Sequence, residues 1–340
     1  MSDVEPHDIG TAVRQVLGDS LAYLYPAALR AAVRACVAEH LSDGPMTAGQ
    51  LAALAGVQAE PLRRVLRLLA THGVFREDDG GMFHLTSAAS LLRGDAPVSV
   101  RSLVLLFTDQ MYWLPAGRLE DTVRKGETVF GDLFGSRFFD HLPDDEERAE
   151  TFYAAMAELS VTEQGAIAGS YEFPETGTVV DIAGGRGGML HAVLARNPGL
   201  RGVLFEREPL VRHHKLDDPA LAGRWETAVG DFFTAVPPGA DIYLLKRILH
   251  DKTDTDSVRI LRSCREAMSD GARLLIIDAV VPTDGRPHPS VISDVLMLAV
   301  FEGRERTAAE LSDLLLTAGL RLGRVIDTPV TLSIAEAVIA

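Results

Sequence analysis

The sequence is poor in cysteine and in positive charge, and each shortage argues against a class of protein. Only two of the 340 residues are cysteines, Cys36 and Cys264, each in a helix-like segment and neither in a Cys-x-x-Cys pair. A disulfide framework or a cysteine-based metal site is therefore not expected. Lys and Arg total 33 against 48 Asp and Glu, a formal net charge of −15. Because proteins bind nucleic acid mainly through basic side chains, this balance argues against a nucleic-acid partner.

Long apolar runs are also missing. No apolar run approaches the length of a membrane span, and the N-terminus lacks a charged segment followed by an apolar one. We therefore expect no membrane partner, no secretory signal and a cytoplasmic location. The composition, 47% hydrophobic and 24% charged, is that of a globular protein. A length of 340 residues favours two domains, or one large domain with an accessory.

The first hundred residues predict a small, mainly helical domain. An apolar-periodic stretch over Val13–Leu41 is followed by a helix that begins after Thr47 as N-cap and ends in a turn at Gly56. A further helix is expected over Ala59–Leu69, and Gly73–Leu85 resembles a β-hairpin with a polar, glycine-rich tip. Helix, turn, helix and hairpin in this order are typical of a winged helix.

A winged helix has two competing uses, DNA binding and dimerisation. The second helix of the motif carries Arg63, Arg64 and Arg67, which could contact phosphates. Against DNA binding stands the strongly acidic balance of the whole chain. The alanine- and leucine-rich first helix has more apolar surface than a lone accessory domain can bury, so we expect a partner subunit and a homodimer.

From Val179 onward, strand-like and helix-like runs alternate, which predicts a mostly parallel sheet with helices on both faces. A short connection, Thr328–Val330, joins the last two strands. Because such a connection can join only antiparallel strands, the last strand should run against the others. The expected strands are Val179–Ala183, Gly202–Glu206, Trp225–Val229, Ile242–Leu245, Arg273–Val281, Arg321–Asp327 and Thr331–Ile339, and the expected helices are Met189–Arg196, Asp254–Met268 and Thr307–Ala318.

The most informative stretch is Val179–Gly188, a buried strand that runs into a glycine-rich loop. The loop fails the dinucleotide spacing G-x-G-x-x-G because Leu190 stands where the third glycine belongs, and no Lys-Ser/Thr pair follows to make a phosphate-binding loop. Asp181 at the strand end suits a different ligand. An adenosine linked to an amino acid, without phosphates, needs a carboxylate and backbone N–H donors.

Two further acids follow the next two strands. Glu206 ends the second strand and is placed to accept the ribose hydroxyls. Asp231 follows the third strand, where it can accept the adenine amino group while Phe232 stacks on the ring. Each acid alone could equally be a helix cap or a surface charge, but an ordered series at three successive strand ends predicts one nucleoside site.

Several segments together resemble class I S-adenosylmethionine-dependent methyltransferases. More narrowly, the chain resembles the O-methyltransferases typified by plant caffeate and flavonoid enzymes and by bacterial enzymes that tailor aromatic antibiotics. It covers essentially the whole chain and is carried by VVDIAGGRGG, the acid in LFEREP, GDFF, LLKRILHDK and FEGRERT.

The resemblance implies a Rossmann-like α/β methyltransferase domain with a seven-stranded sheet, preceded by a winged-helix dimerisation domain. It divides the chain into a dimerisation domain (1–100), a helical connector that contributes to the substrate pocket (101–174) and a cofactor-binding domain (175–340). It also implies S-adenosylmethionine as methyl donor, S-adenosylhomocysteine as product, and no metal. The residues implied to bind the cofactor are Asp181, Gly184, Gly185, Glu206, Asp231, Phe232 and Lys246.

The family's catalytic histidine matches His250, just past the fourth strand, where open α/β sheets place their ligands. Histidine suits removal of a phenolic proton because its pKa lies near neutrality. The resemblance offers Asp278 and Glu305 as carboxylates for the second ring nitrogen. Asp278 departs from the plant pattern, which has Glu there. Glu302 is a third acid nearby, but Glu305 lies in the Glu-Arg-Thr run that matches the family.

The acceptor side is less specific. Phe152, Met156, Met297 and Phe301 are candidates for lining an aromatic substrate, although a core role is at least as good an explanation. The expected activity is O-methylation of a phenolic hydroxyl in antibiotic biosynthesis. The alternatives are N-methylation, hydroxylation or decarboxylation on the same fold, and a winged-helix regulator that senses a small molecule. A metal-binding His-Asp phosphohydrolase would need a second His/Asp cluster, which the sequence lacks.

Overall fold

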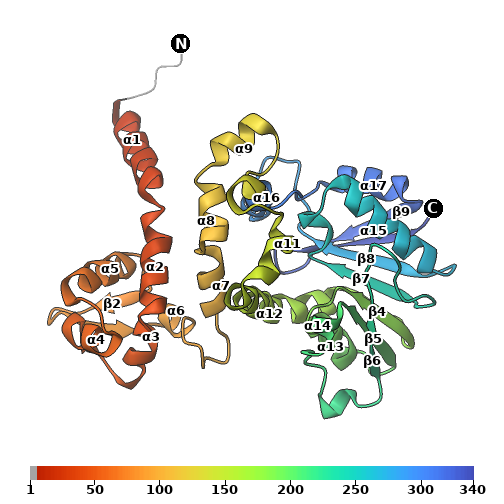
Figure 1. Cartoon of the computed structure of the whole chain (residues 1–340), viewed down its shortest axis with the longest axis horizontal. Helices are drawn as coiled ribbons and strands as arrows, with labels where there is room; N and C mark the ends of the chain where they lie inside the picture. Colours follow the sequence, from red (N-terminus) through yellow and green to blue (C-terminus); the bar gives the residue numbers. More distant parts are fainter. Residues whose placement is uncertain (1–5) are drawn as a thin grey trace. The chain divides into compact units, whose positions relative to one another are not determined.

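The computed structural model describes residues 6–340, which form two compact units divided between Gln110 and Met111 (Figure 1). The first unit is mainly helical and has its own apolar core. Its helices are α1 (Pro6–Leu21), α2 (Leu24–Arg34), α3 (Val37–His40), α4 (Ala48–Ala55), α5 (Ala59–Thr71), α6 (Ser87–Ser90) and α7 (Arg101–Phe107), and its strands are β1 (Met46–Thr47), β2 (Phe75–Glu77) and β3 (Met82–Leu85).

The helix, turn, helix and hairpin predicted for this unit are present. A capping box starts α4, because Thr47 Oγ1 accepts from Gln50 N and Gln50 Oε1 accepts from Thr47 N. Gly56 ends α4 in the left-handed conformation. Strands β2 and β3 form the antiparallel hairpin, and β1 pairs with the outer side of β3. Two ion pairs occupy arginines of α5: Arg64 with Glu60 and Arg67 with Glu77.

The structure corrects two details of this region. The apolar-periodic stretch is three helices rather than one, with breaks at Ala22–Tyr23 and at Ala35–Cys36. Cys36 therefore lies between α2 and α3, not inside a helix, and its φ of 49° is left-handed. Helices α2 and α3 both bury apolar residues in one core, Ala28, Ala32 and Val33 from α2 and Val37 and Ala38 from α3. The apolar pattern therefore continues across the break, and the sequence alone does not show where the helices end.

The second unit is built on a seven-stranded sheet with the order β6-β5-β4-β7-β8-β10-β9. Strands β4 to β8 are parallel, and β10 is antiparallel to both of its neighbours, as predicted. The strands are β4 (Gly177–Ile182), β5 (Leu200–Glu206), β6 (Trp225–Val229), β7 (Ile242–Lys246), β8 (Arg273–Asp278), β9 (Leu320–Ile326) and β10 (Ser333–Ile339).

Helices cover both faces of this sheet. Two apolar clusters form, one between the sheet and helices α15 and α17, the other between the opposite face and helices α12 and α13. The helices of the unit are α8 (Gln110–Ala116), which begins at the boundary, α9 (Leu119–Lys125), α10 (Phe130–Phe134), α11 (Phe138–His141), α12 (Glu146–Ser170), α13 (Gly188–Arg196), α14 (Glu208–Val211), α15 (Asp254–Ala267), α16 (Ser290–Val300) and α17 (Ala308–Thr317). No helix in the described part of the chain is long and apolar enough to cross a bilayer.

Three strands end earlier than predicted; β9 stops at Ile326, one residue before the predicted Asp327. β4 stops at Ile182 because Ala183 has a left-handed φ of 55°. β8 stops at Asp278, three residues short of the predicted Val281. Beyond it, the backbone leaves β10 and pairs with Arg306 instead: Val280 forms a parallel bridge with that residue, and Val281 N donates to its carbonyl at 3.0 Å. The early end of β8 brings the segment before α17 to the edge of the sheet.

Candidate active site

The carboxyl ends of five parallel strands meet at one edge of the sheet, and each end carries a charged residue. Parallel strands place these ends side by side, which is where open α/β sheets bind ligands. In the order of the strands across the sheet, the residues are Asp231 after β6, Glu206 at the end of β5, Asp181 in β4, Lys246 at the end of β7 and Asp278 at the end of β8. The edge is therefore the candidate site.

The buried carboxylate of Asp181 lies directly against the glycine loop. Its carboxylate is 1% exposed, and Oδ2 accepts from Leu190 N at 3.2 Å. A side chain at Gly184 would collide with Asp181 Oδ2 at 2.4 Å and with Leu204 Cδ1 at 2.7 Å. The loop therefore needs glycine there to fit over its own carboxylate. At Gly185, with φ of 57°, a Cβ would meet no atom of the described residues within 4 Å, so the space beside that position is open.

Glu206 and Asp231 differ in their surroundings. Glu206 is 7% exposed and accepts from two backbone amides, Gly185 N at 3.2 Å and Arg207 N at 2.8 Å. It therefore ties the end of β5 to the glycine loop. Asp231 is exposed and accepts from Phe233 N at 2.8 Å, while the Phe232 ring packs against the Phe233 ring and the apolar core.

Lys246 has a partner that the sequence does not reveal. Its Nζ lies 3.0 Å from Glu163 Oε2, and the guanidinium of Arg247 bonds both oxygens of the same carboxylate. Glu163 comes from the middle of α12 and is 5% exposed. The pKa of Lys246 is lowered by burial, an effect that the nearby carboxylates of Glu163 and Asp181 partly offset. Burial raises the pKa of Asp181 to about 7, against a smaller opposing effect of the Leu190 amide.

Two residues other than glycine have a left-handed backbone at this edge. Ala183 follows β4 with φ of 55°, and Arg247 follows β7 with φ of 56°. Each is held by a hydrogen bond to the next strand: Ala183 N donates to Phe205 O at 2.8 Å and Arg247 N donates to Ile277 O at 3.0 Å. Such conformations are unfavourable without glycine and cluster at functional sites.

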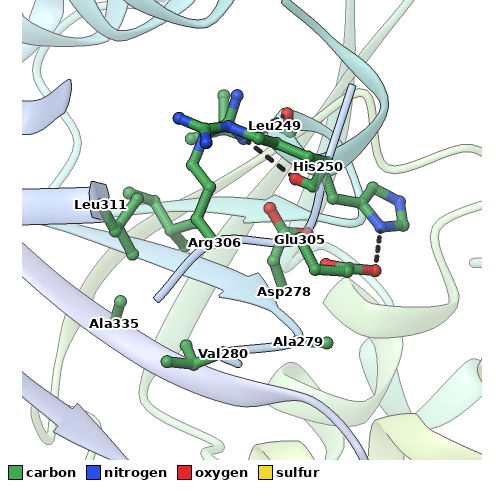
Figure 2. Close-up of a pocket in the computed structure, with 11 residues that line it drawn as sticks. Leu249, His250, Asp278, Ala279, Val280, Glu305, Arg306, Leu311 and Ala335 are labelled. Carbon is green, nitrogen blue, oxygen red and sulfur yellow. Dashed lines mark hydrogen bonds and ion pairs between the residues drawn. The ribbon is translucent and has the colours of Figure 1, made fainter. Parts of the chain in front are cut away.

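His250 lies in a short 3-10 turn after β7 (Leu249–Asp251) and is 7% exposed. Its Nδ1 lies 2.9 Å from Glu305 Oε1 (Figure 2). Glu305 is itself held by α16, because Ser293 Oγ donates to Oε1 and the Glu305 amide donates to Asp294 Oδ1 at 2.9 Å. The second ring nitrogen of His250 points away from Glu305 and is the atom left to accept a proton.

The charges around His250 set its protonation. Burial acts to lower the pKa of His250, but the bond to Glu305 and the negative charges of Asp278 and Glu305 outweigh it, so the pKa is raised. Burial acts to raise the pKa of Glu305, and the contact with His250 more than reverses that effect, so this carboxyl stays ionised. The pair is arranged to stabilise an imidazolium, the form that follows proton uptake.

The three candidate acids have different places. Glu305 bonds to the ring, whereas Asp278 lines one pocket together with His250 and Glu305, and burial raises its pKa. Among the hydrogen bonds of the described residues, none joins Asp278 to His250, consistent with its short side chain. Glu302 pairs with Arg137 at 3.1 Å and is about one-third exposed. The structure therefore favours Glu305 as the partner of the ring.

Aromatic rings gather on α11, α12 and the residue after α16. Phe138 is 5.6 Å from Phe152 and 4.7 Å from Phe301 between ring centroids, and Phe139 lies within 6.0 Å of both. Two of the predicted substrate residues thus share one cluster. Of the other two, Met297 is buried in α16 and Met156 is half-buried in α12. Among the described residues, no group of three or more His, Cys, Asp and Glu is arranged to hold a metal ion.

Comparisons with known proteins show the family of the chain. Residues 117–321 match the family of O-methyltransferase domains, and residues 20–95 match the O-methyltransferase dimerisation domain. The chain belongs to the O-methyltransferase family. This O-methyltransferase is 40% identical over 330 residues to "Mitomycin biosynthesis 6-O-methyltransferase" of Streptomyces lavendulae, covering 94% of this chain and 93% of the relative.

Solved structures give the same result. CalO1, a methyltransferase in calicheamicin biosynthesis in its SAH-bound form, is 46% identical with a TM-score of 0.87, covering 99% of this chain and 100% of that one. NcsB1, an O-methyltransferase from neocarzinostatin biosynthesis in complex with S-adenosylmethionine and a hydroxy-methyl naphthoic acid, is 32% identical with a TM-score of 0.79, over 93% and 96% of the two chains. The predicted fold, a mainly helical dimerisation domain followed by the methyltransferase sheet, is confirmed.

Two relatives have names that describe other chemistry. "Aclacinomycin 10-hydroxylase RdmB" of Streptomyces purpurascens is 35% identical over 304 residues, covering 87% of this chain and 81% of the relative. "Phenazine-1-carboxylate N-methyltransferase" of Pseudomonas aeruginosa is 30% identical over 307 residues, covering 88% and 89%. Membership of the family thus leaves the acceptor atom to be argued from the site.

Proposed function

We propose that this O-methyltransferase transfers a methyl group from S-adenosylmethionine to a phenolic hydroxyl of an aromatic small molecule in antibiotic biosynthesis, with His250 as general base. One observation carries the proposal. His250 is buried at the carboxyl edge of the sheet, bonded at Nδ1 to an ionised Glu305, with its second ring nitrogen left to accept a proton.

The cofactor side of the edge fits a donor with an amino-acid tail. Asp181 Oδ1 is buried without a hydrogen-bond partner among the described residues, and a Cβ at Gly185 would meet none of their atoms within 4 Å. A cationic amino group near Asp181 would satisfy that oxygen and favour its ionised form. Glu206, Asp231 and Phe232 would hold the nucleoside. S-adenosylmethionine supplies the electrophilic methyl group when bound.

The remaining task of the protein is alignment and proton removal. A methyl transfer needs the acceptor oxygen in line with the methyl group, which the aromatic cluster around Phe138 and Phe301 would favour by holding a planar ring. Nε2 of His250 takes the phenolic proton, and Glu305 stabilises the resulting imidazolium. Asp278 adds a second negative charge near the ring. A positioned base of this kind contributes about 10²–10⁴-fold to rate.

We also propose a homodimer formed through the first unit. Helix α1 exposes Val16, Leu17 and Leu21 to between 57% and 64%. An apolar helix face of this kind is a candidate contact for a second copy, and the match of residues 20–95 to a dimerisation domain supports it.

The test is mass spectrometry of acceptors incubated with enzyme and S-adenosylmethionine. A panel of hydroxynaphthoic acids, other phenols and matched aromatic amines should show the gain of one methyl group on phenols only. Fragmentation assigns the methyl to oxygen. Methylation of the amines instead, or gain of oxygen or loss of carbon dioxide from an acceptor, would support the changed chemistries that some relatives' names describe.

A further inference from the structure

One face of the His250 turn is enclosed by the segment Gly303–Arg306. Glu305 holds the histidine ring, and two other residues of the segment hold the backbone that carries it. A Cβ at Gly303 would lie 2.1 Å from His250 O and 2.5 Å from Asp251 C. Backbone atoms cannot give way as a flexible side chain can, so only glycine fits here.

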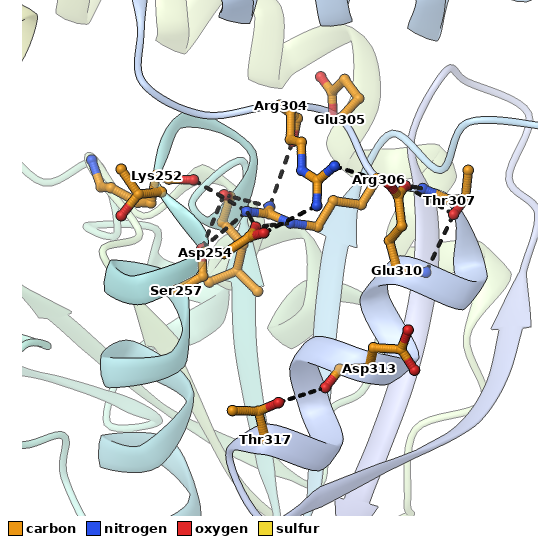
Figure 3. Close-up of polar contacts among 12 residues, drawn as sticks. Lys252, Asp254, Ser257, Arg304, Glu305, Arg306, Thr307, Glu310, Asp313 and Thr317 are labelled. Carbon is orange, nitrogen blue, oxygen red and sulfur yellow. Dashed lines mark hydrogen bonds and ion pairs between the residues drawn. The ribbon is translucent and has the colours of Figure 1, made fainter. Parts of the chain in front are cut away.

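The Arg306 guanidinium bonds to a backbone carbonyl at each end of the same turn. Its guanidinium is 5% exposed, and Nη1 donates to Leu249 O at 2.8 Å while Nη2 donates to Lys252 O at 3.1 Å (Figure 3). These carbonyls flank His250. Asp254 Oδ1 accepts from Nε at 3.1 Å and from Nη2 at 2.8 Å, which fixes the plane of the guanidinium. Only arginine provides this fan of donors in one plane.

The backbone of Arg306 is anchored as well. It forms the parallel bridge with Val280 just past β8, so its position follows the edge of the sheet. Glu305 and Arg306 are neighbours in this extended segment, and their side chains therefore leave in different directions. One reaches the imidazole and the other reaches the turn behind it, as Figure 2 shows.

We propose that Arg306, anchored by Asp254, is a positioning residue for the base: it fixes the Leu249–Lys252 turn so that the His250 ring stays on Glu305. The inference deepens the proposed function, since it rests on the role of His250 as base. In this role, Arg306 acts through the backbone of the turn and not by contact with cofactor or acceptor.

The test is the titration of His250, followed by NMR in the protein without ligands, with the signal assigned by its loss in His250→Gln. Arg306→Lys keeps the charge but cannot reach both carbonyls. We expect its His250 pKa to fall toward the ordinary histidine value, because the ring loses its fixed contact with Glu305. With a hydroxynaphthoic acid that the enzyme methylates, kcat should fall about 10- to 100-fold, the usual cost of a misplaced group, with S-adenosylmethionine affinity unchanged.

Arg304→Lys is the matched control. Arg304 also pairs with Asp254, at 3.0 Å, and with Glu310, at 2.9 Å, but it is half-exposed and its guanidinium contacts neither carbonyl of the turn. Its His250 titration and kcat should equal those of the wild type. If Arg306→Lys titrates like the wild type, the positioning role is wrong.

A third variant covers the case in which Arg306→Lys does not fold. Asp254→Asn removes the negative charge that holds the Arg306 guanidinium, and the Asp254 side chain is 54% exposed, so the fold should tolerate the change. The His250 pKa should fall in this variant too, but by less than in Arg306→Lys. An unchanged titration in this variant would then overturn the proposal. The proposed function fails separately: His250→Ala with wild-type turnover would refute the general base while leaving the NMR result intact.

Discussion

Two regions at the same end of one sheet are built differently. The cofactor edge consists of Asp181, Glu206 and Asp231, proposed to bind the cofactor, and the base cluster consists of His250 with Glu305 and Ser293. On the cofactor edge, Asp181, Glu206 and Asp231 each lie at or just after the end of their own strand, and their contacts are largely with nearby backbone amides. In the base cluster, His250 is held by Glu305, 55 positions later, and Glu305 is held in turn by Ser293, 12 positions before it. The contacts of Asp181 and Asp231 span at most nine positions and that of Glu206 with Gly185 spans 21, whereas the contact of His250 with Glu305 spans 55.

Their electrostatics differ in the same way. Asp181 is buried with little compensation, so burial raises its pKa to about 7. Glu305 is also buried, but its bond to His250 outweighs burial and lowers its pKa. The cofactor edge therefore has charge that a cationic ligand can stabilise, whereas the base cluster is already balanced by its own partners.

The largest effect is expected from a substitution that removes only the base. His250→Ala should lower kcat by about 10²–10⁴-fold, because proton removal from the acceptor loses its base. The affinity for S-adenosylmethionine, measured by calorimetry, should stay that of the wild type, because the cofactor edge is unchanged. Equal losses of affinity and turnover would show that the two regions are not separable.

A smaller effect comes from Glu305→Gln, with Glu302→Gln as the matched control. Loss of a charged hydrogen bond of about 1.5–3 kcal/mol should lower kcat by roughly 10- to 100-fold. Because Glu305 raises the pKa of His250, the acid limb of the kcat–pH profile should move to lower pH in this variant.

Glu302→Gln should leave both kcat and the acid limb unchanged, since Glu302 pairs with Arg137 on the surface. If the two variants behave alike, the assignment of the ring's carboxylate partner is wrong.

A subtler effect belongs to the cofactor edge. Binding of a cationic amino group needs ionised Asp181, whose pKa is about 7. The Kd for S-adenosylmethionine should therefore fall by up to about tenfold per pH unit as pH rises from about 5.5 toward 7. S-adenosylhomocysteine carries the same amino group and should follow the same curve.

Asp181→Asn should bind more weakly and flatten this dependence. A wild-type affinity that does not change across this range would contradict the assignment of Asp181 to the amino group.

No effect is expected from DNA. Arg64 and Arg67 in α5 already pair with Glu60 and Glu77, and the whole chain has a net charge of −15. A gel shift with excess protein at low salt should show no retarded band. A band that disappears on Arg63→Glu would revive the regulator hypothesis.

The same contrast explains how much the sequence could predict. The strands, the glycine loop and the series of acids can be predicted from the sequence because each is recognised from a few neighbouring residues. The family resemblance also proposed His250 and Glu305, and the structure brings them to 2.9 Å. The assignment of these residues to catalysis and to the cofactor stays a prediction.

The site residues that the sequence does not reveal make their contacts between separate segments of the chain. Glu163 is one acid in a 25-residue helix, and nothing in its neighbours indicates that it binds Lys246 and Arg247. Ser293 lies in an apolar helix whose pattern points to packing. The left-handed residues Ala183 and Arg247 depend on tertiary hydrogen bonds, which a strand pattern does not show.

The most direct test of the general base compares wild type and His250→Ala on phenols of increasing acidity. A base matters most when the acceptor holds its proton tightly and little when the acceptor is already ionised. We expect the ratio of wild-type to variant kcat to fall steadily as the pKa of the phenol falls. A ratio that stays constant across the series would contradict it and assign His250 to alignment of the acceptor alone.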